Sequence, residues 1–235
     1  MADGFSIRPI AHIRTQFPEK FGIPRQSGLV PSLRALIVFE PEFRVPEAFR
    51  GLERYSHLWL IWQFSGALRE EWSPTVRPPR MGGNTRMGVF ATRSPFRPNS
   101  LGLSSVGLEE VRFTGPDGPV LAVSGADLMD GTPIFDIKPY LPYTDCHPDA
   151  AQGLGSPGGE GLLEVDFPAR LLEQVPADLR GPLLDVLAQD PRPGYQHSPD
   201  REYWMAFGGI EVRFTVQGKA LKVTGVRESG RDKEN

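Results

Sequence analysis

The residues best suited to chemistry in this sequence are arginines without acidic neighbours. Between Ser73 and Leu108 there is no Asp, Glu or Lys, and the segment contains five arginines: Arg77, Arg80, Arg86, Arg93 and Arg97. The whole chain has a formal net charge of −3, so this positive charge is local. Because the electric field follows the local charge distribution, the segment is a candidate anion site. The alternative is an arginine-rich loop whose acidic partners lie elsewhere in the fold.

Several of these arginines stand beside prolines, as does an earlier one. The strings Pro24-Arg25-Gln26, Arg77-Pro-Pro-Arg80 and Arg93-Ser-Pro-Phe-Arg97-Pro share this feature. Proline fixes its own φ and biases the preceding residue toward extended backbone, so each guanidinium projects from a stiffened loop. A preorganised donor loses less entropy when it binds an anion or a carboxylate. These strings therefore favour ligand-binding loops over a purely structural role.

A second polar segment is rich in carboxylates. It reads Asp127-Leu-Met-Asp130-Gly-Thr-Pro and is soon followed by Asp136. One interpretation is a simple turn at Asp130-Gly131, in which the Asp side chain bonds the local backbone. The other is a loop that surrounds a cationic or amine-bearing ligand.

The spacing of other reactive residues argues against several kinds of site. Histidines His12, His57, His147 and His197 are scattered, and Cys146 has no cysteine partner, so we expect no metal site and no intrachain disulfide. The string Gly153-Leu-Gly155-Ser-Pro-Gly158 matches the dinucleotide fingerprint. That motif requires a strand before it and a helix after it, and neither is expected here. We interpret the string as part of a linker.

These loops need a scaffold, and the hydrophobic pattern predicts one made of strands. Short segments rich in β-branched or aromatic residues alternate with breakers at residues 5–12, 33–39, 57–64, 87–92, 101–113, 120–128 and 133–137. Segment 57–64 is almost continuously apolar, which is typical of a strand buried on both faces. Many short strands favour a barrel or sandwich over alternating βα units. The predicted fold class is therefore mainly β for a domain at residues 1–150.

A small α+β C-terminal domain is predicted at residues 162–228, after a Gly-rich linker at 151–161. Its expected elements are a strand at 162–167, a helix at 176–189 and a closing hairpin. The hairpin has strands at 210–216 and 220–226, joined by a three-residue loop. The charged tail at 229–235 is expected to fray.

Length and composition suit a soluble globular protein. The chain has 235 residues, of which 39% are hydrophobic and 23% charged, and its 26 glycines and 24 prolines predict long ordered loops. The longest apolar stretches are five residues, whereas a bilayer requires about 18. The N-terminus has no apolar segment of the signal-peptide type. We therefore expect a cytoplasmic protein without membrane association.

Taken in order, the polar strings resemble the TrmO family of tRNA methyltransferases, which have the TsaA-like fold. The resemblance is dense from about Phe5 to Tyr143 and resumes at residues 186–193. It rests on Pro24-Arg25-Gln26-Ser-Gly-Leu, Gly51-Leu-Glu-Arg-Tyr-Ser-His57-Leu-Trp, Arg77-Pro-Pro-Arg80, Gly88-Val-Phe-Ala-Thr-Arg93-Ser-Pro-Phe-Arg97-Pro-Asn99, Asp127-Leu-Met-Asp130-Gly-Thr-Pro and Asp136-Ile-Lys138-Pro-Tyr140-Leu-Pro.

The resemblance implies an S-adenosylmethionine-dependent enzyme on a β-barrel-like fold of mixed strands. Its reaction would methylate N6 of N6-threonylcarbamoyladenosine at tRNA position 37, next to the anticodon, in threonine tRNAs. It also implies a homodimer with the cofactor near the subunit interface. The family's cofactor contacts fall on Pro24, Arg25, Gln26, Ser65, Gly66, Arg93, Leu103, Asp127, Leu128, Met129 and Asp130.

Two departures from the family pattern affect these expectations. Relatives often carry His-Gln where this chain has Ser65-Gly66, so a contact there should use the backbone. The common Arg-Pro-Asn-Pro string ends in Ser100 here, which loosens the loop without removing a functional group.

The chemistry of the implied reaction suggests further roles. Methyl transfer from a sulfonium is an in-line displacement that depends on alignment and on exclusion of water, and it needs no metal. N6 of a carbamoylated adenine is a weak nucleophile, so we hypothesise that Asp130, Asp136 or the substrate's own carboxylate takes its proton. Lys138 and Tyr140 would position the threonylcarbamoyl group.

The arginine segment would then serve the RNA. Arg77, Arg80, Arg86 and Arg97 are predicted to contact phosphates of the tRNA anticodon arm, with Phe96 available to stack an exposed base. Two other functions stay open at this point. One is an RNA-binding module that uses S-adenosylmethionine only as an effector, and the other is a small-molecule methyltransferase on the same fold.

Overall fold

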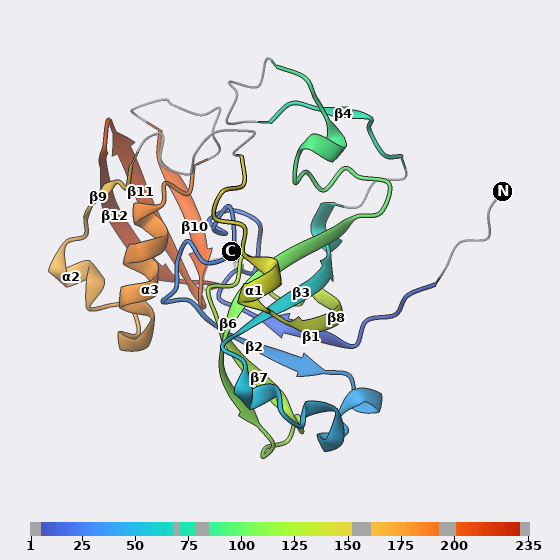
Figure 1. Cartoon of the computed structure of the whole chain (residues 1–235). Helices are drawn as coiled ribbons and strands as arrows, with labels where there is room; N and C mark the ends of the chain where they lie inside the picture. The colour runs from blue at the N-terminus through green and yellow to red at the C-terminus, as the bar shows by residue number, and fades with distance from the viewer. Residues whose placement is uncertain (1–5, 68–70, 79–84, 152–160, 193–200, 231–235) are drawn as a thin grey trace.

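A closed barrel of six strands forms the first part of the fold. The computed structural model describes residues 6–67, 71–78, 85–151, 161–192 and 201–230. Around the barrel the strand order is β1-β2-β7-β6-β3-β8 (Figure 1). The strands are β1 (Ala11–Arg14), β2 (Arg34–Phe39), β3 (His57–Gln63), β6 (Leu101–Arg112), β7 (Val120–Ser124) and β8 (Pro133–Pro139). The prediction of a mainly β, barrel-like fold is confirmed.

All strand pairs of this barrel are antiparallel. The mixture of strand directions that the resemblance implied occurs instead in a second sheet, where β12 (Ala220–Glu228) runs parallel to β9 (Glu164–Asp166). Short connections, which suit antiparallel neighbours, link β6 to β7 and β7 to β8.

Strand β3 shows how the barrel selects its interior. Leu58, Leu60 and Trp62 are buried in the barrel core, while the alternate residues of the strand are partly or largely exposed. The prediction that this strand is buried on both faces is therefore wrong. Successive side chains of a strand point to opposite faces, and only one face of a barrel strand meets the core. The apolar residues on the outer face, Trp59 and Ile61, are left for another use.

Other predicted strands differ at their ends. The first begins only at Ala11, and the one expected at 120–128 stops at Ser124 because Gly125 has a φ of 72°. The strand expected at 87–92 is reduced to β5 (Met87–Gly88), which pairs only with β4 (Thr75–Val76). It continues as the 3-10 turn η6 (Val89–Ala91), and among the described residues no third strand extends this ribbon.

Short helical turns fill the connections and were not predicted. Between β2 and β3 lie η1 (Pro41–Phe43), η2 (Pro46–Phe49) and η3 (Leu52–Arg54), and after β8 lies α1 (Pro142–Asp145). Phe49 is buried, and its ring meets that of Phe39 edge-on at 4.7 Å between centroids. These turns therefore close one end of the barrel with apolar side chains.

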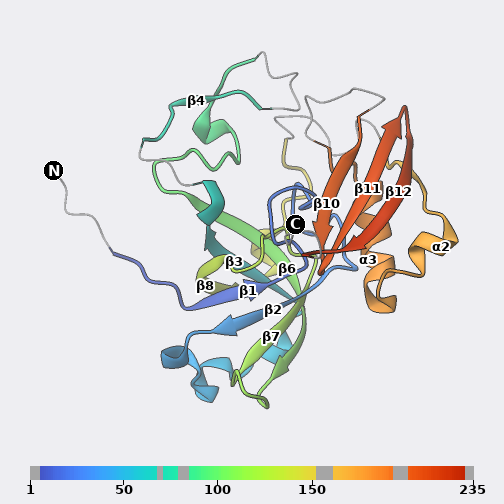
Figure 2. The same ribbon diagram turned by 180° about the vertical axis from the view of Figure 1, so that it is seen from behind.

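The C-terminal part is a separate sheet in the order β10-β11-β12-β9 (Figure 2). It adds β10 (Tyr203–Phe207) and β11 (Ile210–Gln217) to β9 and β12, with α2 (Ala169–Leu172) and α3 (Ala177–Ala188) beside them. The predicted helix and hairpin are confirmed, whereas α2 and β10 were missed. Gln217 pairs with Ala220, so the hairpin loop has two residues, not three.

The connection between β1 and β2 joins the two parts. Phe17, Val30 and Leu33 are buried in the core of the C-terminal sheet, and the Phe17 and Phe207 rings lie 5.4 Å apart between centroids. Gly208 N donates to the carbonyl of Gln16 at 2.8 Å. Residues 16–33 thus run between the barrel and the C-terminal sheet (Figure 2).

Some predicted features lie outside the described residues, or almost so. They include Arg80, most of the linker at 151–161 and most of the tail at 229–235. The proposed division between residues 150 and 162 stays a prediction. Within the described ranges, no helix has the length and apolar character that crossing a membrane requires.

Candidate active site

A cavity of about 620 Å³ lies where β3 ends and β6 begins. Its walls come from the β1–β2 connection, the 3-10 turn η4 (Ser65–Ala67), the segment that follows η6, and the β7–β8 loop. These four elements come from distant parts of the sequence, and the barrel brings them to one end. This is the geometry that a rigid scaffold with functional loops provides.

Most of the residues that the resemblance assigned to a cofactor line this one cavity. They are Pro24, Arg25, Gln26, Ser65, Gly66, Arg93, Leu103, Asp127, Leu128 and Met129. Asp130 is the exception, because its Oδ1 accepts a hydrogen bond from the Thr15 backbone N–H at 2.9 Å and its side chain is not part of the cavity wall. The Asp130 side chain thus bonds a distant backbone group, which matches neither the local turn nor the ligand-binding loop expected for it.

Asp127 is the carboxylate of the cavity, and a buried chain of hydrogen bonds holds it. Trp62 Nε1 donates to Ser104 Oγ at 3.0 Å, and Ser104 Oγ donates to Asp127 Oδ1 at 2.6 Å. Burial raises the pKa of Asp127, and the hydrogen bond from Ser104 and the charge of Arg93 only partly oppose this rise. A desolvated carboxylate in a cavity is a strong ligand for a positively charged group.

The remaining charges of the cavity wall are positive. They belong to Lys20, Arg25, Arg93 and Arg97. Among the described lining residues, Asp127 is thus the one acid among four basic side chains. The cavity can therefore receive a ligand that carries both a carboxylate and a cationic group.

The C-terminal part holds the first of these arginines. Arg25 Nη2 donates to the backbone carbonyls of Asp190 and Arg192 at 3.4 and 3.5 Å. The carboxylate of Asp190 in turn accepts from Arg192 Nε and Nη2, both at 2.8 Å. Burial would raise the pKa of Asp190, but its hydrogen bonds and ion pair with Arg192 outweigh burial and lower it. Asp190 also has a φ of 54°, which Asp tolerates better than most residues.

We predict that Asp190→Asn weakens cofactor binding indirectly. Asn keeps the left-handed backbone but loses the charged pair, so stability should fall by about 1.5–3 kcal/mol. The pKa of Asp190 is lowered on folding. The variant's loss of unfolding free energy relative to wild type should therefore be complete above pH 3.8 and should shrink as the pH falls through the folded-state pKa. Thermal unfolding and calorimetric titration with S-adenosylmethionine measure both effects. The control is Asp166→Asn on exposed β9, and equal affinities for Asp190→Asn and wild type would contradict the proposed support of Arg25.

The described arginines of the segment between Ser73 and Leu108 occupy three different places. Arg97 Nη1 donates to the carbonyl of Thr92 at 2.7 Å and to those of Val89 and Ser94 at 3.5 Å, so this side chain shapes the loop after η6. Arg93 Nη1 donates to Gln26 Oε1, which joins two walls of the cavity. Arg77 and Arg86 are exposed and lie at the β4–β5 ribbon, away from the cavity wall.

A second cavity of about 400 Å³ adjoins the first on the outer face of the barrel. Arg93 and Leu103 line both cavities. The other walls of the second cavity are Ser27, His57, Trp59, Ser105, Tyr140 and Asp145. The Trp59 and Tyr140 rings lie 5.4 Å apart between centroids. The apolar outer face of β3 therefore forms part of a pocket and is not covered by another layer.

Asp145 fixes the orientation of the tryptophan in this second cavity. Its Oδ2 accepts from Leu141 N at 2.8 Å and from Trp59 Nε1 at 2.9 Å. The hydrogen bond from the Leu141 backbone, followed by that from Trp59, lowers the pKa of Asp145. Burial, with the neighbouring Cys146 and Asp145, raises the pKa of Tyr140, so its hydroxyl stays a hydrogen-bond donor.

The residues predicted for catalysis are only partly brought together. Asp136 and Lys138 alternate along β8 and Tyr140 follows its last residue, and Lys138 Nζ lies 2.9 Å from Asp136 Oδ2. In the register, Lys138 stands opposite Trp59 and Asp136 opposite Ile61. Tyr140 lines the second cavity, whereas neither Asp130 nor Asp136 lines either one.

Sequence reasoning missed Trp59, Trp62, Gly102, Ser104 and Asp145. The alternation of β3 would have separated Trp62 from Trp59 once a barrel was assumed. No local pattern marks Ser104, because its role depends on the pairing of β6 with β3 and on the position of the β7–β8 loop.

Comparison with known proteins identifies the class that this barrel and its two cavities represent. Residues 12–146 match the family model of the tRNA-methyltransferase O N-terminal domain, and residues 162–229 match that of the TrmO C-terminal domain. The chain therefore belongs to the TrmO family of tRNA methyltransferases.

Individual relatives cover almost the whole chain. The tRNA (adenine(37)-N6)-methyltransferase of Escherichia coli is 41% identical over 93% of this chain and 96% of its own length. A putative S-adenosylmethionine-dependent methyltransferase of Pseudomonas aeruginosa is 43% identical over 89% of this chain and 91% of its own. The crystal structure of TrmO from P. aeruginosa superposes with a TM-score of 0.78 at 35% identity, covering 97% of this chain and 99% of that one.

Proposed function

We propose that this chain is an S-adenosylmethionine-dependent methyltransferase that acts on N6 of adenine 37 in tRNA. We further propose that the substrate is N6-threonylcarbamoyladenosine in threonine tRNAs. The observation that carries the proposal is the pair of adjoining cavities: one has a single desolvated carboxylate among basic side chains, and the other has two aromatic rings. Family membership and the names of the relatives support the reaction class.

The charges of the first cavity fit S-adenosylmethionine. That molecule has a carboxylate, an ammonium group and a sulfonium, and it supplies an activated methyl group when bound. Asp127 would face its positive groups, while Arg25, Arg93 or Lys20 would pair with its carboxylate. The two hydrogen bonds that link Trp62, Ser104 and Asp127 keep the Asp127 side chain in a fixed orientation before any ligand binds. Little reorganisation is therefore required on binding.

The second cavity fits the acceptor base. Trp59 and Tyr140 offer aromatic faces for a flat nucleobase, and an RNA base in a loop can be splayed out to reach them. Arg93 stands between the two cavities, and Lys138 lies beside Trp59 in the register. Either side chain would pair with the carboxylate of the threonylcarbamoyl group. The protein's main contribution would be to align the acceptor nitrogen with the methyl group and exclude water.

The group that removes the proton from N6 is the part of the reaction that remains to be assigned. We propose that Asp130, Asp136 or the substrate's own carboxylate accepts this proton. If a side chain does so, one of the variants Asp130→Asn and Asp136→Asn should lower kcat by about 100-fold or more with KM little changed. Full turnover by both folded variants in a steady-state assay would instead assign the step to the substrate's carboxylate.

We also propose that the chain works as a homodimer whose interface lies near the cavities. Leu103 is 54% exposed near the start of β6, and Tyr143 is 86% exposed in α1. Large apolar side chains this exposed beside a site suit a surface that a second copy covers. Light scattering of the purified chain gives the oligomeric state, and a monomer at assay concentration would contradict this part of the proposal.

The experiment that tests the function uses the purified full chain with labelled S-adenosylmethionine and tRNA that carries the threonylcarbamoyl group. Mass spectrometry of the digested nucleosides should show one added methyl on that nucleoside and none on tRNA lacking the group. Binding of S-adenosylmethionine without methyl transfer would indicate an effector-binding module. Methyl transfer that proceeds without RNA would indicate a small-molecule enzyme.

A further inference from the structure

An arm of the chain projects from the barrel and takes no part in either cavity wall. Its described residues are 71–78 and 85–90, which include the β4–β5 ribbon (Figure 1). Two hydrogen bonds connect it with the following loop: Ser73 N donates to the carbonyl of Phe96 at 3.3 Å, and Arg97 Nη1 donates to that of Val89 at 3.5 Å. Phe96 lines the first cavity, so the arm begins at the edge of the proposed cofactor site.

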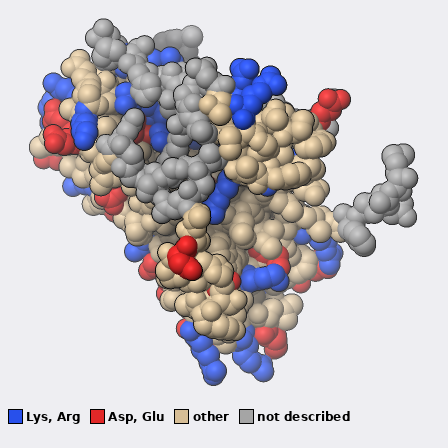
Figure 3. All heavy atoms as spheres, turned by 45° about the horizontal axis from the view of Figure 1, so that its top comes forward, with Lys and Arg blue, Asp and Glu red and all other residues tan. Residues whose placement is uncertain are grey.

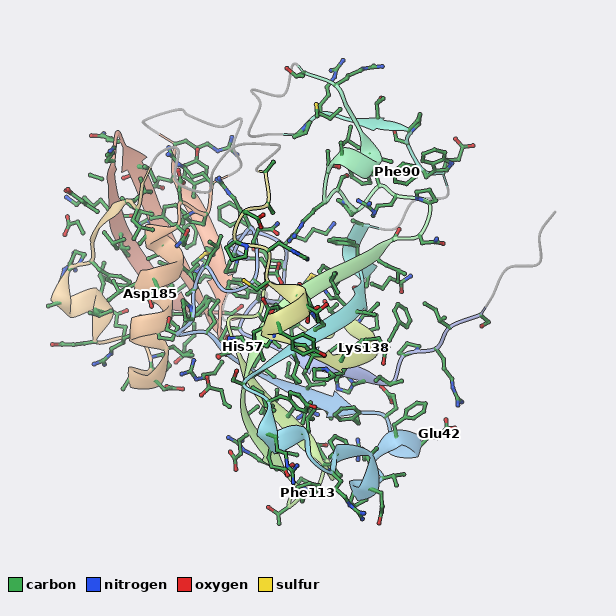
Figure 4. The ribbon with its side chains drawn as sticks, in the orientation of Figure 1. Glu42, His57, Phe90, Phe113, Lys138 and Asp185 are labelled. Atoms are coloured by element: carbon green, nitrogen blue, oxygen red, sulfur yellow. The ribbon has the colours of Figure 1, made fainter. Side chains whose placement is uncertain are left out.

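Two aromatic side chains of this arm are exposed together. Trp72 is 48% exposed and Phe90 is 73% exposed. Their rings are nearly parallel, with 24° between the planes and 6.2 Å between the centroids. Figure 4 shows Phe90 on the arm, distant from the barrel core. An exposed pair of this kind offers a face on which a nucleobase can stack, whatever its identity.

Two arginines of the arm flank the last residue pair of the ribbon. Val76 pairs with Met87, and Arg77 follows Val76 while Arg86 precedes Met87. Like charges on neighbouring chain segments repel each other. Neither arginine has an ion pair or a side-chain hydrogen bond within the part of the chain that the structure describes, and the sole acid in the described arm is Glu71. An anion between the two guanidinium groups would relieve this repulsion.

We propose that the arm binds a single-stranded segment of RNA, with a base stacked on Trp72 and Phe90 and a phosphate held by Arg77 and Arg86. This inference rests on the proposed function and adds a residue-level RNA contact outside the cavities. The arm combines two exposed aromatic rings with two exposed arginines, and a single strand of RNA offers the bases and phosphates that match both. The space-filling view shows Lys and Arg side chains gathered at the top of the molecule, the region in which the arm lies (Figure 3). The arm would set RNA affinity and leave the chemistry at N6 to the cavities.

Variants of the arm separate the two contacts. Trp72→Leu combined with Phe90→Leu keeps apolar bulk but removes the aromatic faces, and it should raise the Kd for tRNA about 10- to 100-fold. Arg77→Gln combined with Arg86→Gln should reduce the slope of log K against log salt by about 0.7, the value for one phosphate of a single strand. One matched control is Phe113→Leu, an exposed ring at the opposite end of the barrel (Figure 4). The other is the pair Arg50→Gln with Arg54→Gln, which are exposed residues on either side of Gly51 at the start of η3. Binding is measured by fluorescence anisotropy of labelled tRNA at several salt concentrations.

Two further measurements keep this test apart from that of the proposed function. S-adenosylmethionine affinity and methyl transfer at saturating tRNA should equal those of wild type in both arm variants, with unchanged circular dichroism. A tRNA Kd within twofold of wild type for both arm variants would overturn the proposal. So would loss of the dimer in light scattering, which would make the arm a subunit contact. If wild-type protein binds tRNA through the arm but transfers no methyl group, the proposed function fails and the arm proposal stands.

Discussion

Asp127→Asn is expected to raise the Kd for S-adenosylmethionine about 100-fold and to lower kcat/KM by at least as much, because the cavity loses the negative charge that would face the cofactor's cationic groups. Asn keeps the shape of the side chain and can still accept the hydrogen bond from Ser104. The change therefore tests the charge and not the packing. Calorimetric titration and steady-state kinetics measure the two quantities.

The same substitution should make the free protein more stable at neutral pH. The pKa of Asp127 is raised on folding, so ionisation costs more in the folded chain than in the unfolded one. The unfolding free energies of wild type and Asp127→Asn should be most similar below pH 3.8. As the pH rises from there to the folded-state pKa, wild type should become progressively less stable than the variant. Above that pKa the difference should be constant, and it would appear as a melting temperature about 2 °C higher for the variant.

The matched control for Asp127 is Asp117→Asn, since Asp117 makes a surface ion pair with Arg14 at 3.0 Å, away from the cavity wall. It should change neither the affinity nor the direction of the pH dependence. Unchanged S-adenosylmethionine affinity in Asp127→Asn would remove the carboxylate from the proposed cofactor site.

Gly102→Ala is expected to damage both the fold and the site. A Cβ at this position would lie 2.3 Å from the Trp62 ring, which is buried at 7% exposure and cannot easily move. Overpacking of this kind costs about 1–3 kcal/mol, or roughly 5 °C in melting temperature. Displacement of the ring would also break the hydrogen bond from Trp62 to Ser104, so the orientation of Asp127 and cofactor affinity should be lost together.

Gly181→Ala is the control for Gly102→Ala. Gly181 lies inside α3, and a Cβ there would meet nothing within 4 Å. Alanine favours a helix interior over glycine, but a Cβ in helical backbone is disfavoured directly before Pro182, so this variant should melt close to wild type and bind S-adenosylmethionine normally. If Gly102→Ala also melts at or above the wild-type temperature, the tight contact with Trp62 is not a constraint on the fold.

The sequence was most informative where a residue's role follows from its own loop. The proline-flanked Arg25 and the Asp127 loop were recognised as polar loops, and the structure brings both to one cavity. Arg97 has the same local features as Arg93, yet its guanidinium holds three carbonyls of its own loop. In one kind of loop the arginine is available to a ligand, and in the other its hydrogen bonds hold the loop itself in shape. The local sequence does not distinguish these two cases.

Features that depend on which strands become neighbours were beyond prediction. Trp62, Ser104 and Asp127 come from β3, β6 and the β7–β8 loop, and only closure of the barrel makes them a chain. The contact of Asp190 and Arg192 with Arg25 depends in the same way on how the β1–β2 connection passes the C-terminal sheet. Hydrophobic periodicity gives the face that each residue occupies, but not the partner across the gap.

Residues 16–33 belong to both parts of the molecule, so the stability of the barrel site and that of the C-terminal sheet depend on each other. Phe17, Val30 and Leu33 complete the apolar interior of the C-terminal sheet, and the stretch between them supplies Pro24, Arg25 and Gln26 to the cavity. Removal of the C-terminal part would therefore expose these apolar side chains to solvent. It would also free the backbone segment that they hold in place, so the barrel alone should not be an active enzyme. Conversely, a ligand that tightens this strip should slow amide exchange in β10 and β11, far from where it binds.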